Sequence, residues 1–120
     1  LHGLMANSPA FHELEKGTIA LPEFLSAFQH ELDLAGLSKN DIIAKEIITE
    51  LFRAAVPRPH VLDALSKLRQ AGFVVVALTN NFKVRKSDLR GSDMAQFDAV
   101  FDAVFESCVL VMRKPEPGIY

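Results

Sequence analysis

The chain has 120 residues, of which 49% are hydrophobic and 23% are charged, a composition typical of one globular domain. A formal net charge of -2 at pH 7 argues against a general electrostatic role on nucleic acid or an acidic membrane. The longest apolar run, residues 73–78, is far too short to span a membrane. The single cysteine, Cys108, excludes an internal disulfide and fits a reducing compartment, so we expect a cytoplasmic protein.

Two amphipathic helices are predicted in the first half of the chain. The first covers residues 22–36, where proline suits the first turn and glycine suits the end. The second follows residues 38–41, whose Ser-Lys-Asn-Asp sequence resembles a capping box. The apolar positions at helical spacing are Phe24, Leu25, Phe28 and Leu32, then Ile43, Ile47, Ile48, Leu51 and Phe52. The sequence Val-Pro-Arg-Pro at 56–59 breaks this pattern, and we place a hinge there.

The second half of the chain has the pattern of an α/β fold. A third helix with apolar residues at 61, 62, 65 and 68 is predicted to end at Gly72 in a left-handed cap. The apolar run FVVVAL follows at once and predicts a strand buried on both faces, inside a parallel sheet covered by helices. Residues 101–112 predict a weaker second strand, or a strand followed by a turn.

Polar residues follow the first predicted strand abruptly, at Thr79, Asn80 and Asn81. Open α/β sheets place their ligand sites at the carboxyl ends of the strands. Further along the chain, Arg-Lys-Pro-Glu-Pro at 113–117 interrupts the second β-type stretch. These two polar segments are the candidate site.

The order of these segments resembles a known family. The residues that carry the resemblance are FHELEKGTIALPEFLSAF, then PRPHVLDALSKLRQAGFVVVALTNN, then FDAVFESCVLVMRKPEPGIY. Together they are similar to haloacid dehalogenase-like (HAD) hydrolases that carry a small helical cap. Within that superfamily they are most similar to the phosphatase domain at the N-terminus of soluble epoxide hydrolases and to the related domain of acyl-CoA dehydrogenase family member 10.

The resemblance implies an α/β fold in two parts. Residues 1–56 correspond to a helical cap-like subdomain. Residues 57–120 correspond to a partial Rossmann-like HAD core of parallel strands with flanking helices. The implied activity is that of a magnesium-dependent phosphatase, which hydrolyses a phosphate monoester through an aspartyl-phosphate.

The resemblance also assigns roles to three residues. Thr79 occupies the family's second motif, Lys114 the third, and Asn80 is a neighbouring support, so all three are predicted to bind phosphate, with Thr79 and Lys114 catalytic. The chemistry fits these residue types, because phosphoryl transfer depends on donors and cations that hold the non-bridging oxygens. A lysine ammonium offsets the dianion as a point charge.

Two motifs of the family are not found in these 120 residues. The Asp-x-Asp pair that supplies the nucleophile is absent, so we expect its strand to precede Leu1. The later acidic pair, which completes the magnesium site in the family, is expected beyond Tyr120. No metal ligand is therefore assigned in this chain. A further departure is Val111, where relatives commonly have glycine just before the Met-x-Lys-Pro sequence.

Other polar residues are interpreted as structural. The basic segment with Lys83, Arg85, Lys86 and Arg90 is more simply a solvated surface than a device that steers an anionic substrate. The four histidines lack metal-ligand spacing. Asp98, Asp102 and Glu116 are interpreted as structural, and Cys108 as a small buried residue.

Three functions remain open from the sequence. The first is a phosphatase acting on a small phosphorylated substrate, with the nucleophile outside this chain. The second is a non-catalytic module that binds a protein partner or itself through exposed sheet edges. The third is a 2-haloacid dehalogenase, in which the same aspartate attacks carbon. No nucleic-acid or membrane partner is expected.

We predict that the isolated chain lacks phosphatase activity, because it contains no Asp-x-Asp nucleophile. The check is turnover of a generic aryl phosphate with and without magnesium. Magnesium-dependent turnover that Lys114→Ala abolishes would contradict this prediction.

Overall fold

The computed structural model describes residues 2–37 and 42–120. The helices and strands, in chain order, are α1 (His2–Asn7), α2 (Pro9–Glu15), α3 (Leu21–Leu34), α4 (Ala44–Ala54), α5 (Pro59–Gln70), β1 (Val76–Thr79), the 3-10 helix η2 (Met94–Phe97), β2 (Ala103–Glu106), α6 (Ser107–Leu110) and the 3-10 helix η3 (Pro117–Ile119). The predicted capping box at 38–41 lies outside the described residues. Within those residues, no helix is long and apolar enough to cross a membrane.

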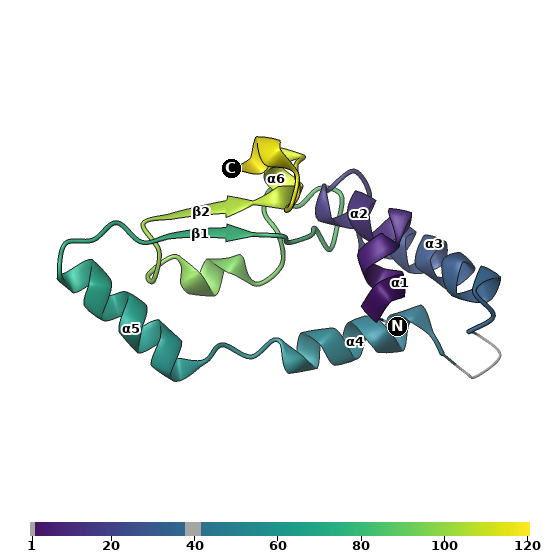
Figure 1. Ribbon diagram of the computed structural model, residues 1–120, viewed down its shortest axis with the longest axis horizontal. Coiled ribbons are helices and arrows are strands. Elements are labelled where there is room, and N and C mark those ends of the chain that lie inside the picture. The colour runs from purple at the N-terminus through teal and green to yellow at the C-terminus, as the bar shows by residue number, and fades with distance from the viewer. Residues whose placement is uncertain (1, 38–41) are drawn as a thin grey trace.

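Helices α1 to α4 form a helical half with its own small core (Figure 1). Phe24, Phe28 and Leu32 lie one turn apart on α3 and are fully buried, as their spacing predicts. The rings of Phe24 and Phe28 stack with centroids 5.2 Å apart. The core is completed by Ala10, Leu14, Ala44 and Ile48, which come from α2 and α4. The two helices predicted from periodicity are therefore present and share one core.

Strands β1 and β2 form a two-stranded parallel sheet in which Val76 pairs with Ala103 and Thr79 with Glu106. The second β-type stretch is a strand followed by the short helix α6, so the strand-plus-turn alternative is correct. Helix α5 occupies the predicted residues, and Gly72 after it has a φ of 87°. This half is the partial α/β core that the sequence predicted.

The prediction that the first strand is buried on both faces is wrong for the described residues. Val75 is buried, but Phe73, Val74 and Val76 are 63%, 79% and 51% exposed. The reason is that the described sheet has only two strands and that no residue of α5 is buried. Figure 1 shows α4 and α5 end to end along one side of the molecule, with α5 beyond the amino ends of the strands. An apolar strand and an apolar helix face therefore remain uncovered.

The helical half meets the α/β half at the turn between α2 and α3. Gly17 has a φ of 70°, and a Cβ built there would lie 2.4 Å from the carbonyl oxygen of Cys108. The backbone N–H of Leu21 donates to the carbonyl of Lys83 at 3.2 Å. Close backbone approach at Gly17 thus sets how the two halves fit together.

We predict that Gly17→Ala lowers the free energy of unfolding by about 2 kcal/mol, because the new methyl group needs both a left-handed backbone and space held by Cys108. Urea unfolding followed by circular dichroism measures the change. The matched control is Gly3→Ala, where no atom lies within 4 Å of the new Cβ. Equal stability of the two variants would show that the contact at Gly17 is unimportant.

Candidate functional site

Two predicted site residues, Asn80 and Lys114, are joined at the carboxyl end of β1 although they lie 34 positions apart in sequence. The backbone N–H of Lys114 donates to Asn80 Oδ1 at 2.8 Å, and Asn80 Nδ2 donates to the carbonyl of Lys114 at 3.2 Å. The Lys114 side chain turns back toward the strand, where Nζ donates to the carbonyl of Leu78 at 2.9 Å. These three hydrogen bonds hold the ammonium group beside the end of β1.

Thr79 is the last residue of β1 and is partly exposed. Its hydroxyl donates to the carbonyl of Asn80 at 3.2 Å, a long bond that a better acceptor can replace. Asn80 therefore neighbours both residues. Thr79 precedes it in the chain, and Lys114 is hydrogen-bonded to its side chain.

A buried polar network supports this end of the sheet. Glu106, which is 3% exposed, accepts hydrogen bonds from Asn81 Nδ2 at 3.1 Å, from the Gly91 N–H at 2.7 Å and from Arg90 Nε at 3.1 Å. The Asn81 N–H donates to Ser107 Oγ at 2.9 Å. A Cβ at Gly91 would lie 2.5 Å from Glu106 Oε2, so only glycine allows this approach. The carboxylate of Glu106 fixes the loop that follows Asn81.

The sequence placed Asn81 in the candidate polar segment but assigned it no individual role, and it assigned none to Glu106. The available signal was a carboxylate placed directly after an apolar run, in the segment 101–107. Because the pairing register puts Glu106 opposite Thr79, the carboxylate lies at the candidate site only once the sheet has formed.

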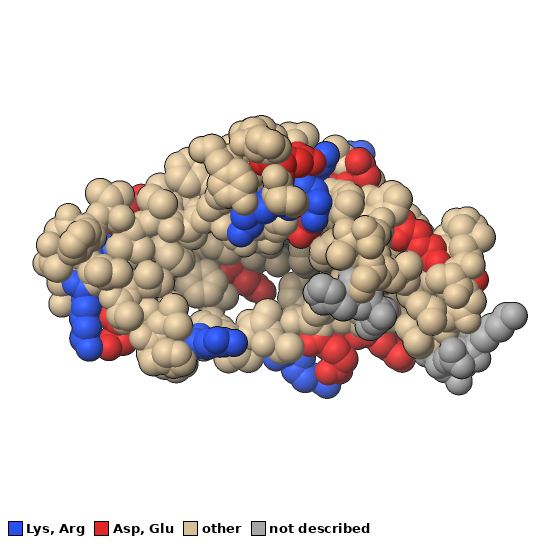
Figure 2. All heavy atoms as spheres, in the orientation of Figure 1, with Lys and Arg blue, Asp and Glu red and all other residues tan. Residues whose placement is uncertain are grey.

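Both arginines of the basic segment, residues 82–90, are paired with carboxylates. Arg85 pairs with Asp88 at 3.1 Å, and Arg90 pairs with Asp98 at 2.9 Å. The backbone N–H of Arg85 is the main reason that the pKa of Asp88 lies below its usual value. Over the face of the molecule drawn in Figure 2, Lys and Arg side chains lie beside Asp and Glu side chains. The interpretation of this segment as a solvated surface fits this arrangement.

Asp102 and Cys108 are structural, as predicted. Asp102 Oδ2 accepts the Val75 N–H at 2.8 Å, and Oδ1 accepts Arg69 Nη2 at 2.8 Å, at the end of the strands opposite Thr79. The Val75 N–H and then Arg69 lower the pKa of Asp102. Burial raises the pKa of the Cys108 thiol to about 11, so it stays protonated at neutral pH.

Glu116 is also structural, and it anchors the turn that carries Lys114. It pairs with Lys16 at 2.6 Å and accepts the Arg113 N–H at 3.2 Å. These contacts, with Lys16 first, lower the pKa of Glu116. The peptide bond between Lys114 and Pro115 is cis.

Val111 has a left-handed backbone conformation with a φ of 57°. A β-branched residue is disfavoured there, whereas glycine adopts this conformation freely. Glycine at this position would relieve the strain that Val111 carries.

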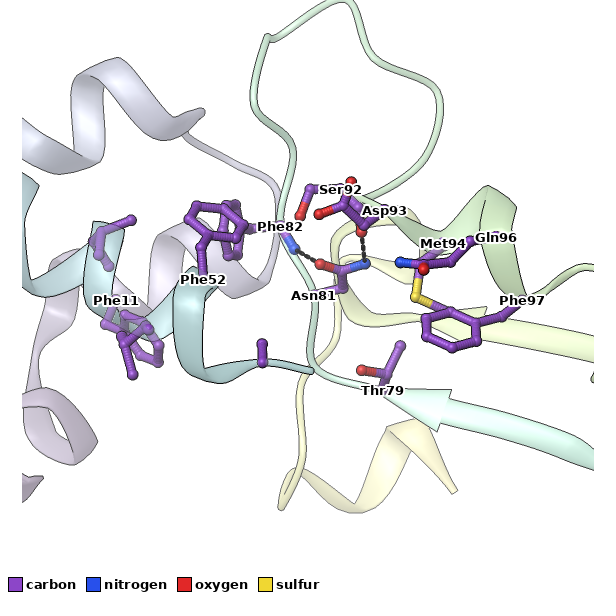
Figure 3. A pocket seen from close by; sticks show the side chains of 13 residues that line it. Phe11, Phe52, Thr79, Asn81, Phe82, Ser92, Asp93, Met94, Gln96 and Phe97 are labelled. Carbon is purple, nitrogen blue, oxygen red and sulfur yellow. Dashed lines mark hydrogen bonds between the residues drawn. The ribbon is translucent and has the colours of Figure 1, made fainter. Parts of the chain in front are cut away.

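A cavity of about 350 Å³ lies between the two halves, with Thr79 and Asn81 in its wall (Figure 3). Most of the lining is apolar and comes from Phe11, Ile48, Leu51, Phe52, Ala55, Phe82, Met94 and Phe97. In Figure 3 the rings of Phe52 and Phe82 lie together on one side, and their centroids are 5.4 Å apart. Lys114 is not among the lining residues. Of the three predicted residues, only Thr79 faces this space.

The described residues do not fit a magnesium site. Within 2–37 and 42–120, no three His, Cys, Asp or Glu side chains are grouped so that they could hold a metal ion. Magnesium prefers carboxylate oxygens and water, and the carboxylate nearest Thr79 in the pairing register, Glu106, is already engaged by Arg90 and Gly91.

Comparison with known proteins identifies relatives. A family model described as haloacid dehalogenase-like hydrolase matches residues 5–120. Bifunctional epoxide hydrolase 2 from Rattus norvegicus is 33% identical over 88 residues, and the protein of the same name from Mus musculus is equally identical over the same length. The matched region covers 72% of this chain but only 16% of each relative.

We predict that Val111→Gly raises the free energy of unfolding by about 0.5–1 kcal/mol, because relief of the left-handed strain exceeds the added flexibility of glycine in the unfolded chain. Thermal unfolding measures the gain. The control is Val109→Gly in α6, where the backbone is helical and glycine is expected to destabilise. A loss of stability in Val111→Gly would contradict the prediction.

Proposed function

This chain belongs to the haloacid dehalogenase-like hydrolase family, and we propose that it supplies the phosphate-holding part of a phosphatase. The substrate class is a phosphate monoester, and the reaction proceeds through an aspartyl-phosphate whose aspartate lies outside these 120 residues. The observation that carries the proposal is the fixed position of the Lys114 ammonium, which Asn80 and the Leu78 carbonyl hold at the carboxyl end of β1.

Each of the three residues has a chemical role in this proposal. The Thr79 hydroxyl and nearby backbone N–H groups donate to the non-bridging oxygens of the phosphate. Lys114 offsets the charge of the dianion and of the attacking carboxylate. The Asn80 side chain bonds both the N–H and the carbonyl of Lys114 and so supports the lysine, and the Asn80 backbone N–H is among the groups proposed to bind the phosphate.

The unpaired edge of β1 supports a nucleophile on a neighbouring strand. Among the described residues, β1 has β2 on one edge and no strand on the other. A parallel strand added to the open edge would end beside Thr79, so a carboxylate after that strand would lie at the phosphate. Such a strand, with its helices, would also cover the exposed residues Phe73, Val74 and Val76.

Magnesium enters the proposal only through the family resemblance. When bound, it would neutralise phosphate charge and orient the oxygens. Its carboxylate ligands would have to come from segments outside the described residues.

The cavity beside Thr79 supports a substrate with an apolar leaving group. Its polar wall contains Thr79 and Asn81, while α4 and η2 supply aromatic and aliphatic side chains. Such a lining buries hydrocarbon, and its further polar side chains, Ser92, Asp93 and Gln96, lie on the same side as η2. In this proposal, residues 1–56 act as a cap over the leaving group and residues 57–120 as the partial core. A cytoplasmic location fits the single buried thiol.

The open edge of β1 also favours a second candidate function, a non-catalytic module. An exposed strand edge can accept a strand from another polypeptide. The two candidates differ in what covers that edge: a strand followed by an aspartate, or a partner that brings no nucleophile.

We predict that, in the full-length protein from the natural source, Lys114→Ala and Thr79→Val each reduce kcat/KM for an aryl phosphate by about 100-fold or more. The matched control is Lys86→Ala, an exposed lysine in the basic segment, which should leave kcat/KM unchanged. Activity that survives both site substitutions contradicts the proposal. Release of halide from a 2-haloacid without phosphatase activity would instead identify a dehalogenase.

A further inference from the structure

We propose that Glu15, at the end of α2, is a positioning residue for Lys114 and acts on it through Arg113. This inference rests on the proposed phosphate-holding role of Lys114. It adds a dependence of the site on the helical half, which the sequence did not assign.

The first observation is an ion pair that connects residues 98 positions apart. Arg113 Nε donates to Glu15 Oε2 at 2.6 Å, and the two side chains are only 15% and 10% exposed. A pair with so little solvent contact is weakly screened, and removal of one partner leaves the other charge buried and uncompensated. Arg113 immediately precedes Lys114, so its side chain fixes where the turn begins.

The second observation is that the next residue of the helical half holds the other end of the same turn. Lys16 pairs with Glu116 at 2.6 Å. Glu116 in turn accepts the Arg113 N–H at 3.2 Å and closes the turn around Lys114 and Pro115. Consecutive residues, Glu15 and Lys16, thus anchor both flanks of the lysine.

The third observation is that Glu15 is itself fixed by its backbone. Its carbonyl accepts the hydroxyl of Ser107 at 2.5 Å, and Ser107 is fully buried. Ser107 Oγ also accepts the N–H of Asn81, which directly follows Asn80. The end of α2 is therefore connected through Ser107 to the loop after β1 and through Arg113 to the Lys114 turn, and we infer that it sets their separation.

The test compares hydrogen exchange at two backbone amides of the 120-residue chain. The Lys114 N–H, bonded to Asn80 Oδ1, reports on the site, and the Asp102 N–H, bonded to the Val75 carbonyl, reports on the far end of the sheet. In Glu15→Gln we expect exchange at Lys114 to become at least about tenfold faster, while exchange at Asp102 stays within about twofold. The control, Glu50→Gln, breaks an exposed ion pair with Arg53 and should change neither amide.

Equal acceleration at both amides, or no acceleration at Lys114, overturns the proposal. If Glu15→Gln does not fold, Arg113→Lys keeps the positive charge but loses the Nε donor, and the same selective loss at Lys114 is expected. Unfolding of both variants would give the pair a purely structural role and would likewise overturn the proposal.

Titration with inorganic phosphate, followed at the amides of Asn80 and Lys114, separates this inference from the proposed function. Binding by the wild-type chain that weakens in Glu15→Gln supports both. Absence of binding by the wild-type chain counts against the phosphate-holding role, whereas the exchange comparison still decides whether Glu15 positions Lys114.

Discussion

The reciprocal hydrogen bonds between Asn80 and the backbone of Lys114 are the constraint on which the candidate site depends. They join the end of β1 to a turn that no strand pairing holds in place. Around them, Glu106 fixes the loop after Asn81, and Glu15 and Lys16 fix the flanks of Lys114. A lysine side chain is long and flexible, and loses much entropy when it is held in one position. These contacts hold the backbone around Lys114, and the Leu78 carbonyl accepts a hydrogen bond from its ammonium group at 2.9 Å.

The same structure leaves a large apolar surface uncovered. It consists of the apolar face of α5, the apolar residues before β1 and the open edge of β1. Such surfaces are normally buried inside an α/β fold, yet here they are exposed. Exposed apolar surface of this kind marks a place where another segment or another protein packs. The open edge of β1 runs from this uncovered surface to Thr79, and for this reason we assign the proposed nucleophile to a strand on that edge.

Local patterns predicted the elements well, because helical periodicity and the β-rich run depend only on neighbouring residues. The helix at 22–36 and the cap at Gly72 are examples. Burial of the first strand was predicted wrongly, since burial depends on which strands and helices surround it. The family resemblance picked out Asn80 and Lys114, which the structure joins. The roles of Glu15 and Glu106 depend on contacts between segments far apart in the sequence, which no local pattern reveals.

The most direct test of the central claim is a crystal structure of the full-length natural protein with a phosphate analogue bound. We predict a parallel strand on the open edge of β1, an aspartate directly after it, and the analogue between that aspartate, Thr79 Oγ1 and Lys114 Nζ. An open edge covered by a segment without a carboxylate, with the analogue bound elsewhere, would contradict the proposed phosphate-binding role of Thr79 and Lys114.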